Sequence, residues 1–206
     1  MKKKENKHWS IWKTALIVLF GLAFTGLLGF AIWEYIVSEK SVVRLGDYLS
    51  LSYTAENRDD AGTQVVDMLV DRSTFGGLVK KEAEDLYEKA IREYKENAEY
   101  FEMSLQDYLK LYFGMTEEDF KKSVKEASVL TAKEEAVLDA VADREGITLE
   151  EMQYEMKLYH YMENAGYTDR ELFLRDYNER ELRIMMRREL TVDFLLTKAK
   201  GPELTD

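Results

Sequence analysis

The chain has 206 residues, of which 46% are hydrophobic and 33% charged, with no cysteine and a formal net charge of −11. The lack of cysteine excludes disulfides, thiol chemistry and a lipid-modified cysteine, and the acidic charge disfavours nucleic acid and anionic lipid headgroups as partners. Because the hydrophobic content is ordinary for a globular domain, the charge does not indicate disorder.

The first element in the chain is an uncharged stretch from Thr14 to Trp33. Eleven of its twenty residues are Leu, Ile, Val or Phe, and a helix of this length spans roughly 30 Å, the thickness of the hydrocarbon core of a bilayer. Lysines dominate before the stretch, so the positive-inside rule places the N-terminus in the cytoplasm and residues 38–206 outside. We therefore predict a single-pass cell-membrane protein, with a cytoplasmic basic tail at 1–13 and an anchor in the lipid bilayer at 14–37.

A cleaved signal peptide is the main alternative to this anchor, and a buried soluble helix is a third interpretation. The apolar region of a signal peptide has about 7–15 residues and ends in small residues at a cleavage site. The stretch here is longer and ends in FAIWEYIVSEK, which contains no A-x-A pattern. The sequence thus favours an anchor that is not cleaved.

Residues 38–64 are a mixed segment that we interpret as a linker with a short extended stub. LSLSY alternates as in a short strand, and ENRDDAG is typical of a loop. Residues 41–206 carry 37 acidic and 23 basic side chains, a net charge of −14. The part beyond the predicted anchor is therefore more acidic than the whole chain.

Helix-start patterns recur beyond Gly77, where glycines are sparse. Ser104, Thr116, Thr148 and Thr168 each follow an apolar residue and precede an acid by three positions. At a helix start, a hydroxyl oxygen accepts backbone N–H groups of the first turn, and a preceding glycine ends the previous helix. The pattern predicts an all-α domain over 65–200, followed by a tail at 201–206. The expected helices lie near 66–72, 78–101, 105–113, 117–145, 149–165 and 169–200.

Two of these helices are long for a domain of this size. Helices of about 29 and 32 residues would span roughly 43 and 48 Å, whereas a compact globule of about 140 residues has a diameter of roughly 37 Å. We therefore expect an elongated domain with protruding helical arms.

Patterns that would indicate catalysis or metal binding are sparse. His160 is the only histidine beyond the predicted anchor, lies in no motif, and is interpreted as a structural or surface residue. The residue counts exclude zinc sites built on cysteine or paired histidines, and no glycine-rich phosphate loop occurs. Acidic pairs such as Glu150 and Glu151 lie in first helical turns, where the helix dipole favours them. We predict no catalytic residue, no metal site and no cofactor.

The helix expected at 149–165 has more apolar surface than one packing face needs. Its apolar residues form two stripes about 200° apart, one of which can pack on a neighbouring helix while the other faces a third helix or a client. The stripes are Met152, Met156 and Tyr159, and Tyr154, Leu158 and Tyr161.

The segment 103–115 is similarly rich in apolar residues. Methionine has a flexible, polarisable thioether that suits a surface accepting varied apolar shapes. The alternative is that these side chains only fill the core of a thin domain. The side chains that we predict to bind an unfolded polypeptide are Met103, Tyr108, Leu109, Tyr112, Phe113, Met115, Met152, Met156, Tyr159, Met162 and Met185.

Five segments carry a family resemblance: VVDMLVDRSTF, LVKKEAEDLYEKAIREY, MSLQDYLKLYFGMTEEDFKKSVKEA, AVLDAVADREGITLEEMQYEMKLY and ELRIMMRRELTVDFLLTKAK. In order and spacing, the chain from about Val65 to Lys200 resembles the C-terminal domain of trigger factor, a bacterial chaperone. The resemblance implies a helical body with two arms that form a cradle for unfolded chains. It also implies an architecture related to the chaperones SurA and PrsA.

Two other domains of that family have no counterpart here. In place of the N-terminal ribosome-binding domain stands the predicted transmembrane helix. VVRLGDYLSLSY resembles the stretch before the family's FKBP-type prolyl isomerase domain, but only about a dozen residues lie between Tyr53 and Val65. We therefore expect neither ribosome docking nor prolyl isomerisation, and no enzymatic activity.

The leading hypothesis is an ATP-independent, membrane-anchored extracytoplasmic chaperone that holds unfolded or nascent exported polypeptides. The secretion machinery is a further expected partner. Many weak contacts, each on the order of 1 kcal/mol or less, would permit release without an energy source. The alternative is a scaffold for one dedicated envelope or secretion partner. A prolyl isomerase is a third hypothesis, which the missing FKBP domain disfavours.

Overall fold

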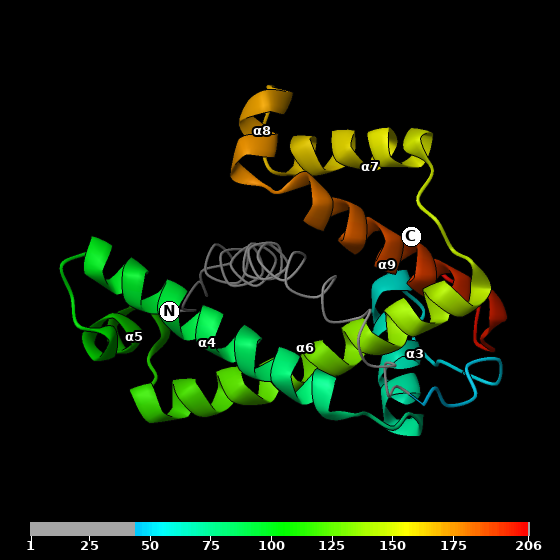
Figure 1. Ribbon diagram of the computed structural model, residues 1–206, viewed down its shortest axis with the longest axis horizontal. Coiled ribbons are helices and arrows are strands. Elements are labelled where there is room, and N and C mark those ends of the chain that lie inside the picture. Colours follow the sequence, from blue (N-terminus) through cyan, green and yellow to red (C-terminus); the bar gives the residue numbers. More distant parts are fainter. Residues whose placement is uncertain (1–43, 206) are drawn as a thin grey trace, which may run out of the picture. The chain divides into compact units, whose positions relative to one another are not determined.

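The computed structural model describes residues 44–205, and the predicted anchor at 14–37 lies outside that range. Within it the chain forms seven α-helices and isolated β-bridges, which confirms the predicted all-α class (Figure 1). No helix in the described range combines the length and the apolar character needed to cross a bilayer. The helices are α3 (Arg58–Arg72), α4 (Gly77–Tyr100), α5 (Leu105–Phe113), α6 (Glu117–Glu145), α7 (Glu151–Asn164), α8 (Arg170–Asp176) and α9 (Glu179–Lys198).

The described residues divide into two compact units. The smaller unit comprises 149–186, with α7, α8 and the start of α9. The larger unit comprises the described residues up to Thr148 and those from Arg187 onward, with α3 to α6 and the rest of α9. One boundary in the sequence, between 186 and 187, thus falls inside α9, and the other, between 148 and 149, falls in the connection between α6 and α7.

The core of the larger unit lies where α3, the C-terminal half of α6 and the end of α9 meet. Val65, Leu69, Val137, Val141 and Leu195 are fully buried there. Helices α3 and α9 approach closely, since a β-carbon added at Gly62 would lie 3.0 Å from Cγ1 of Val192. Glycine at this position lets the two helices pack against each other.

Helix α3 begins at Arg58, earlier than the predicted start near 66, and the loop predicted for ENRDDAG is wrong. Asn57 caps the helix, because its Oδ1 accepts a 2.8 Å hydrogen bond from the backbone N–H of Asp60. Asp59 and Asp60 then lie in the first turn, where the helix dipole favours negative charge. The polar composition of ENRDDAG is typical of a loop, but the segment forms the N-cap and the first turn of α3.

The strand predicted for LSLSY is also wrong, and this segment forms only isolated backbone bridges. Ser52 pairs in parallel with Lys200, and Asn57 pairs in parallel with Thr205. The backbone N–H of Tyr53 donates to the carbonyl of Lys200 at 2.9 Å. The incoming segment and the C-terminal tail therefore lie side by side along several residues.

Helices α4 and α6 form a long hairpin in the larger unit, with α5 packed against both (Figure 1). The predicted bounds 105–113 and 117–145 agree with the structure. The hydroxyl oxygens of Ser104 and Thr116 accept from the backbone N–H groups of Asp107 and Asp119, each at 3.1 Å. These two predicted N-caps are confirmed.

Glycines in the left-handed conformation end α5 and α6. Gly114 and Gly146 both have a φ of 66°, a value that costs a residue with a side chain about 1 kcal/mol or more. The helix ends that were predicted at these glycines therefore follow from a backbone conformation that glycine adopts easily.

The smaller unit begins its helices at caps other than the predicted ones. Helix α7 is capped by Glu150, whose backbone N–H donates to Oε1 of Gln153 at 3.1 Å. Helix α8 is capped by Asp169, whose Oδ1 accepts from the backbone N–H groups of Glu171 and Leu172. The predicted caps at Thr148 and Thr168 are wrong, because an acidic residue one or two positions later takes the role.

The long helix predicted over 169–200 is broken into α8 and α9. Tyr177 is extended and stacks on Phe173, with ring centroids 4.5 Å apart. Oδ1 of Asn178 then accepts from the backbone N–H of Arg180 at 3.0 Å, which starts α9. Neither glycine nor proline lies at this break, so the sequence of 169–200 carries no local signal that the helix ends there.

A buried ionic cluster joins three helices of the larger unit. Arg188 of α9 lies 2.6 Å from a carboxylate oxygen of Glu135 and 2.6 Å from one of Asp139, both on α6. Glu82 of α4 belongs to the same cluster, where burial and the nearby Glu135 raise its pKa from 4.5 to about 7. Arg188 thus pairs with two carboxylates, and its charge partly offsets the rise in the pKa of Glu82.

Replacing Glu82 by Gln is expected to stabilise the protein at pH 8 and to have little effect near pH 4. Between its ordinary pKa and the raised value, the folded protein keeps a proton that the unfolded chain releases, so Glu82 lowers stability as the pH rises through this window. The gain at pH 8 is expected to be on the order of 2–3 kcal/mol. Urea unfolding followed by circular dichroism at both pH values measures it.

The exposed Glu84 on the same helix provides the matched control. Glu84→Gln is expected to change the free energy of unfolding by less than about 0.5 kcal/mol, as for most exposed substitutions. If Glu82→Gln changes the free energy of unfolding equally at pH 4 and pH 8, the pKa of Glu82 is not raised in the folded protein.

Candidate polypeptide-binding surfaces

Helix α7 packs through the second of the two predicted stripes. Tyr154 and Leu158 are fully buried against Phe173 of α8 and against Leu182 and Met186 of α9. Burial raises the pKa of Tyr154 to about 12. The side of α7 that carries these residues therefore forms part of the core of the smaller unit.

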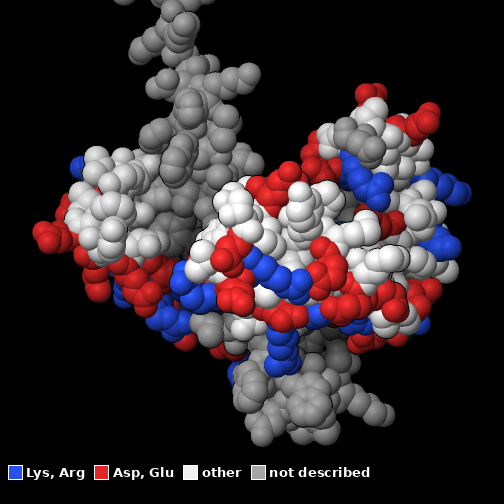
Figure 2. Space-filling view, turned by 90° about the horizontal axis from the view of Figure 1, so that it is seen from above, with Lys and Arg blue, Asp and Glu red and all other residues white. Residues whose placement is uncertain are grey.

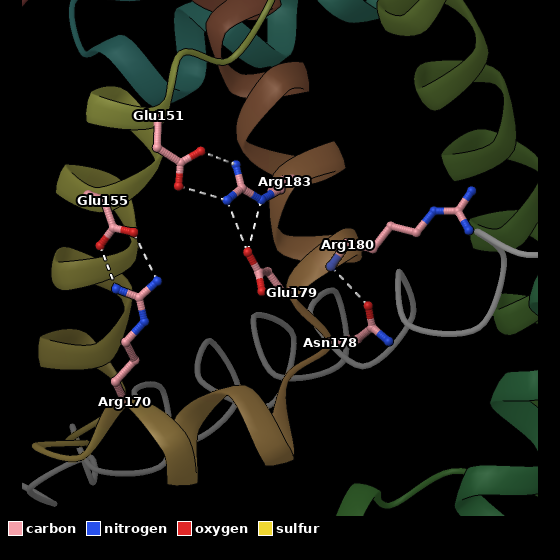
Figure 3. A network of polar contacts seen from close by, with 7 residues as sticks. All are labelled: Glu151, Glu155, Arg170, Asn178, Glu179, Arg180 and Arg183. Carbon is pink, nitrogen blue, oxygen red and sulfur yellow. Dashed lines mark hydrogen bonds and ion pairs between the residues drawn. The ribbon is translucent and has the colours of Figure 1, made fainter.

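A second side of α7 is held by charged hydrogen bonds (Figure 3). Both carboxylate oxygens of Glu155 accept from Arg170, at 2.6 and 2.9 Å. Both oxygens of Glu151 accept from Arg183, each at 3.0 Å. The hydrogen bonds from these arginines hold the pKa values of Glu151 and Glu155 below their ordinary range. Two-point pairs of this kind fix direction as well as distance.

Arg183 also connects this charged side to the core. Its guanidinium lies over the ring of Tyr154, 3.5 Å from the centroid. Its Nη2 lies 3.0 Å from Oε1 of Glu179, on the preceding turn of α9. Cation–π contact and ion pairing act together on one side chain. Rotation of α7 about its axis would break all of these contacts, so the helix orientation is fixed.

The remaining side of α7 carries Met152, Met156 and Tyr159, which we name the α7 stripe. The three residues are 75%, 60% and 64% exposed. Their spacing places them on consecutive turns, roughly opposite the buried side. The predicted surplus of apolar surface is therefore present on this helix, and the exposed stripe is the one formed by the two methionines and Tyr159.

A second apolar surface lies at the end of the α4–α6 hairpin, and we name it the hairpin-tip surface. It comprises Tyr100, Phe101, Leu111 and Tyr112, of which Tyr100 is 82% exposed. The ring of Phe101 contacts Tyr108 and Tyr112, with centroids 5.9 and 5.7 Å apart. The exposed rings thus rest on a packed aromatic layer and are held in place.

Sequence comparison assigns the chain to a family. The family described as the C-terminus of bacterial trigger factor protein matches residues 48–197, which include nearly all of the two units. The chain belongs to the trigger factor C-terminal family. The trigger factor of Carboxydothermus hydrogenoformans is 28% identical over 159 residues, a match that covers 73% of this chain and 36% of that protein. The chain therefore spans about a third of the length of this relative.

The predicted site residues of this family member fall into three classes of burial. Leu109 and Tyr108 are buried in the hairpin and support the surface above them. Met152, Met156, Tyr159 and Tyr112 are exposed. The residues of intermediate exposure are Met103, Phe113, Met115, Met162 and Met185.

Three residues of the hairpin-tip surface were not among the predicted site residues: Tyr100, Phe101 and Leu111. Tyr100 and Phe101 are adjacent aromatics at the C-terminal end of α4, just before the cap Ser104. Two neighbouring rings at a helix end cannot both face one core, which is the signal that could have identified them.

Polar side chains lie next to the α7 stripe. His160 follows Tyr159 on α7, is largely exposed and lies 3.9 Å from Glu163, as expected of a surface histidine. On the face drawn in Figure 2, acidic and basic side chains border areas that carry neither charge.

Proposed function

We propose that the chain is an ATP-independent chaperone that holds unfolded polypeptides on the α7 stripe and the hairpin-tip surface. The observation that carries the proposal is the α7 stripe, which stays exposed on a helix whose opposite side is buried and whose acidic side pairs with Arg170 and Arg183. Membership of the trigger factor C-terminal family supports it. Contiguous exposed apolar side chains on a folded protein often mark a site that another molecule covers.

The two surfaces suit binding without a fixed sequence preference. Methionine side chains adapt to varied apolar shapes, and aromatic rings add large contact areas at low entropic cost. Contacts on the order of 1 kcal/mol each permit rapid release without nucleotide hydrolysis. The acidic character of the chain favours solubility of a complex that carries exposed apolar client segments.

We further propose that residues 14–37 anchor the protein in the cell membrane, with the helical units outside the cytoplasm. The uncharged stretch from Thr14 to Trp33 and the lysines before it support this location. The clients would then be exported polypeptides, with the secretion machinery as a neighbouring partner.

The proposal is tested with the full chain in lipid nanodiscs. Replacing Met152, Met156 and Tyr159 together by Ser is expected to weaken binding of a permanently unfolded client at least about tenfold, since three exposed apolar side chains are lost. Fluorescence anisotropy of the labelled client measures the Kd, and a chemically denatured enzyme tests suppression of aggregation.

A matched control replaces two exposed polar residues on another side of the same helix, His160→Ser and Asn164→Ser. This variant is expected to bind like the wild type, and both variants should keep the same helical circular dichroism. If the wild-type chain leaves aggregation unchanged at several-fold molar excess, the chaperone proposal is wrong. If the triple variant binds as well as the control, the α7 stripe is not the site.

A further inference from the structure

The methionines of the described residues differ sharply in exposure. Met152 and Met156 are 75% and 60% exposed, and Met186, on the packed side of the same unit, is fully buried. The other described methionines have intermediate exposure: Met68, Met103, Met115, Met162 and Met185. The two exposed thioethers lie four positions apart, on neighbouring turns of α7 and on one side of it.

Exposure decides which thioethers react with soluble oxidants. A hydroperoxide transfers one oxygen atom to the sulfur lone pair, which forms the S–O bond, breaks the O–O bond and releases water or an alcohol. The reaction needs direct approach to sulfur and produces a polar, chiral sulfoxide, which reductases return to the thioether. Sulfur atoms inside a packed core are protected from this approach.

We propose that Met152 and Met156 form a reversible oxidation site that turns off the α7 stripe. The inference rests on the proposed function, because the effect of oxidation is a loss of client binding. A sulfoxide brings a strong dipole and hydrogen-bonded water to the surface that clients must dehydrate. Two of the three residues of the stripe change from apolar to polar.

The structure of the smaller unit permits this change without unfolding. Tyr154 and Leu158 hold α7 from the opposite side, and the pairs of Glu151 and Glu155 with arginines lie on another side. Neither set of contacts includes the exposed sulfur atoms. The hairpin-tip surface has no exposed methionine, and Met103 and Met115 near it have only intermediate exposure, so oxidation acts first on the α7 stripe.

Mass spectrometry tests the site directly. The full chain is exposed to hydrogen peroxide for increasing times, quenched and digested with trypsin. The peptide spanning 145–157 contains Met152 and Met156 and no other methionine. Both are expected to oxidise at least about tenfold faster than Met186, whose sulfur is buried. Equal rates at the three positions would overturn the proposal.

Client anisotropy, measured with the same unfolded polypeptide, tests the consequence. Oxidation is expected to raise the Kd about fivefold or more, and a methionine sulfoxide reductase should restore it. The variant Met152→Leu with Met156→Leu keeps the stripe apolar without sulfur, so peroxide should leave its own Kd, measured before treatment, unchanged. The variant Met152→Gln with Met156→Gln should bind like the oxidised protein.

These measurements separate the inference from the function on which it rests. If the untreated chain binds no client, the proposed function fails and the regulation fails with it. If the untreated chain binds but oxidised and reduced proteins bind equally, only the inference is overturned. The same holds if the leucine variant loses binding on oxidation as the wild type does, since the sensitive residue then lies elsewhere.

Discussion

Replacing Arg188 by methionine is expected to destabilise the larger unit by about 3–5 kcal/mol. The side chain of Arg188 is only 15% exposed and that of its partner Glu135 only 12%. Its guanidinium makes a two-point hydrogen bond to Asp139 at 2.6 and 3.0 Å, besides the contact with Glu135. Without it, Glu82, Glu135 and Asp139 remain together with no guanidinium among them.

The loss should depend on pH in a defined direction. Burial already raises the pKa values of Glu82 and Glu135. Removing the positive charge raises them further, so the carboxyl groups take up protons in the folded state and the variant loses more stability at pH 8 than at pH 5. Urea unfolding at the two pH values, followed by circular dichroism, measures both effects.

Two further variants bear on the explanation. Arg92→Met removes an exposed arginine from α4 and is expected to change stability by less than about 0.5 kcal/mol. Adding Glu135→Gln to Arg188→Met should recover part of the loss, because it removes one of the uncompensated charges. A loss for Arg188→Met as small as that for Arg92→Met would mean that the cluster is not tightly coupled.

Replacing Phe173 by alanine is expected to cost about 3–5 kcal/mol within the smaller unit. Phe173 is 1% exposed and lies between Tyr167 and Tyr177, with ring centroids 5.3 and 4.5 Å away. Helix α8 has only seven residues, too few to be stable without packing. Loss of this ring should therefore free α8 and uncover Tyr154 and Leu158 of α7.

Amide hydrogen exchange resolves where the effect occurs. Protection is expected to fall in α7 and α8 of the Phe173→Ala variant and to stay unchanged in α3, which lies in the core of the larger unit. Leu172→Ala changes the neighbouring, half-exposed side chain and should leave both regions protected. Exchange that increases equally in α3 and α7 would show that the two units unfold together.

Sequence patterns predicted those helix starts and ends that are determined by residues close to them in the chain. The bounds of α5 and α6 follow from Ser104 and Thr116 at their starts and from left-handed Gly114 and Gly146 at their ends. Each of these signals acts within a few residues, so it is visible without any knowledge of tertiary contacts.

The parts that were missed depend on contacts between distant residues. Asn57 caps α3 inside a segment that looked like a loop, and the tail around Lys200 pairs with a segment that looked like a strand. The break before α9 depends on Tyr177 packing against Phe173. Periodicity along the chain carries no information about such partners.

The two exposed apolar surfaces show the same division. Spacing alone separated α7 into two apolar stripes, but only the packing of Tyr154 and Leu158 against α8 and α9 showed that Met152 and Met156 stay exposed. At the hairpin tip, composition indicated an apolar segment but not which rings lie at its surface. Tyr108 is covered by Phe101, a contact that crosses the turn between α4 and α5.

The paired backbone of residues 51–57 and 200–205 has a consequence for how this body combines with other polypeptides. Tyr53 donates to Lys200, and Thr205 donates to Glu56, so the segments before α3 and after α9 are joined by backbone hydrogen bonds. Leu51 of the first segment is buried in the core of the larger unit, and Leu204 of the second packs against that core. A polypeptide fused beyond either segment would therefore pull on both of them at once, because each covers part of the same core and each holds the other.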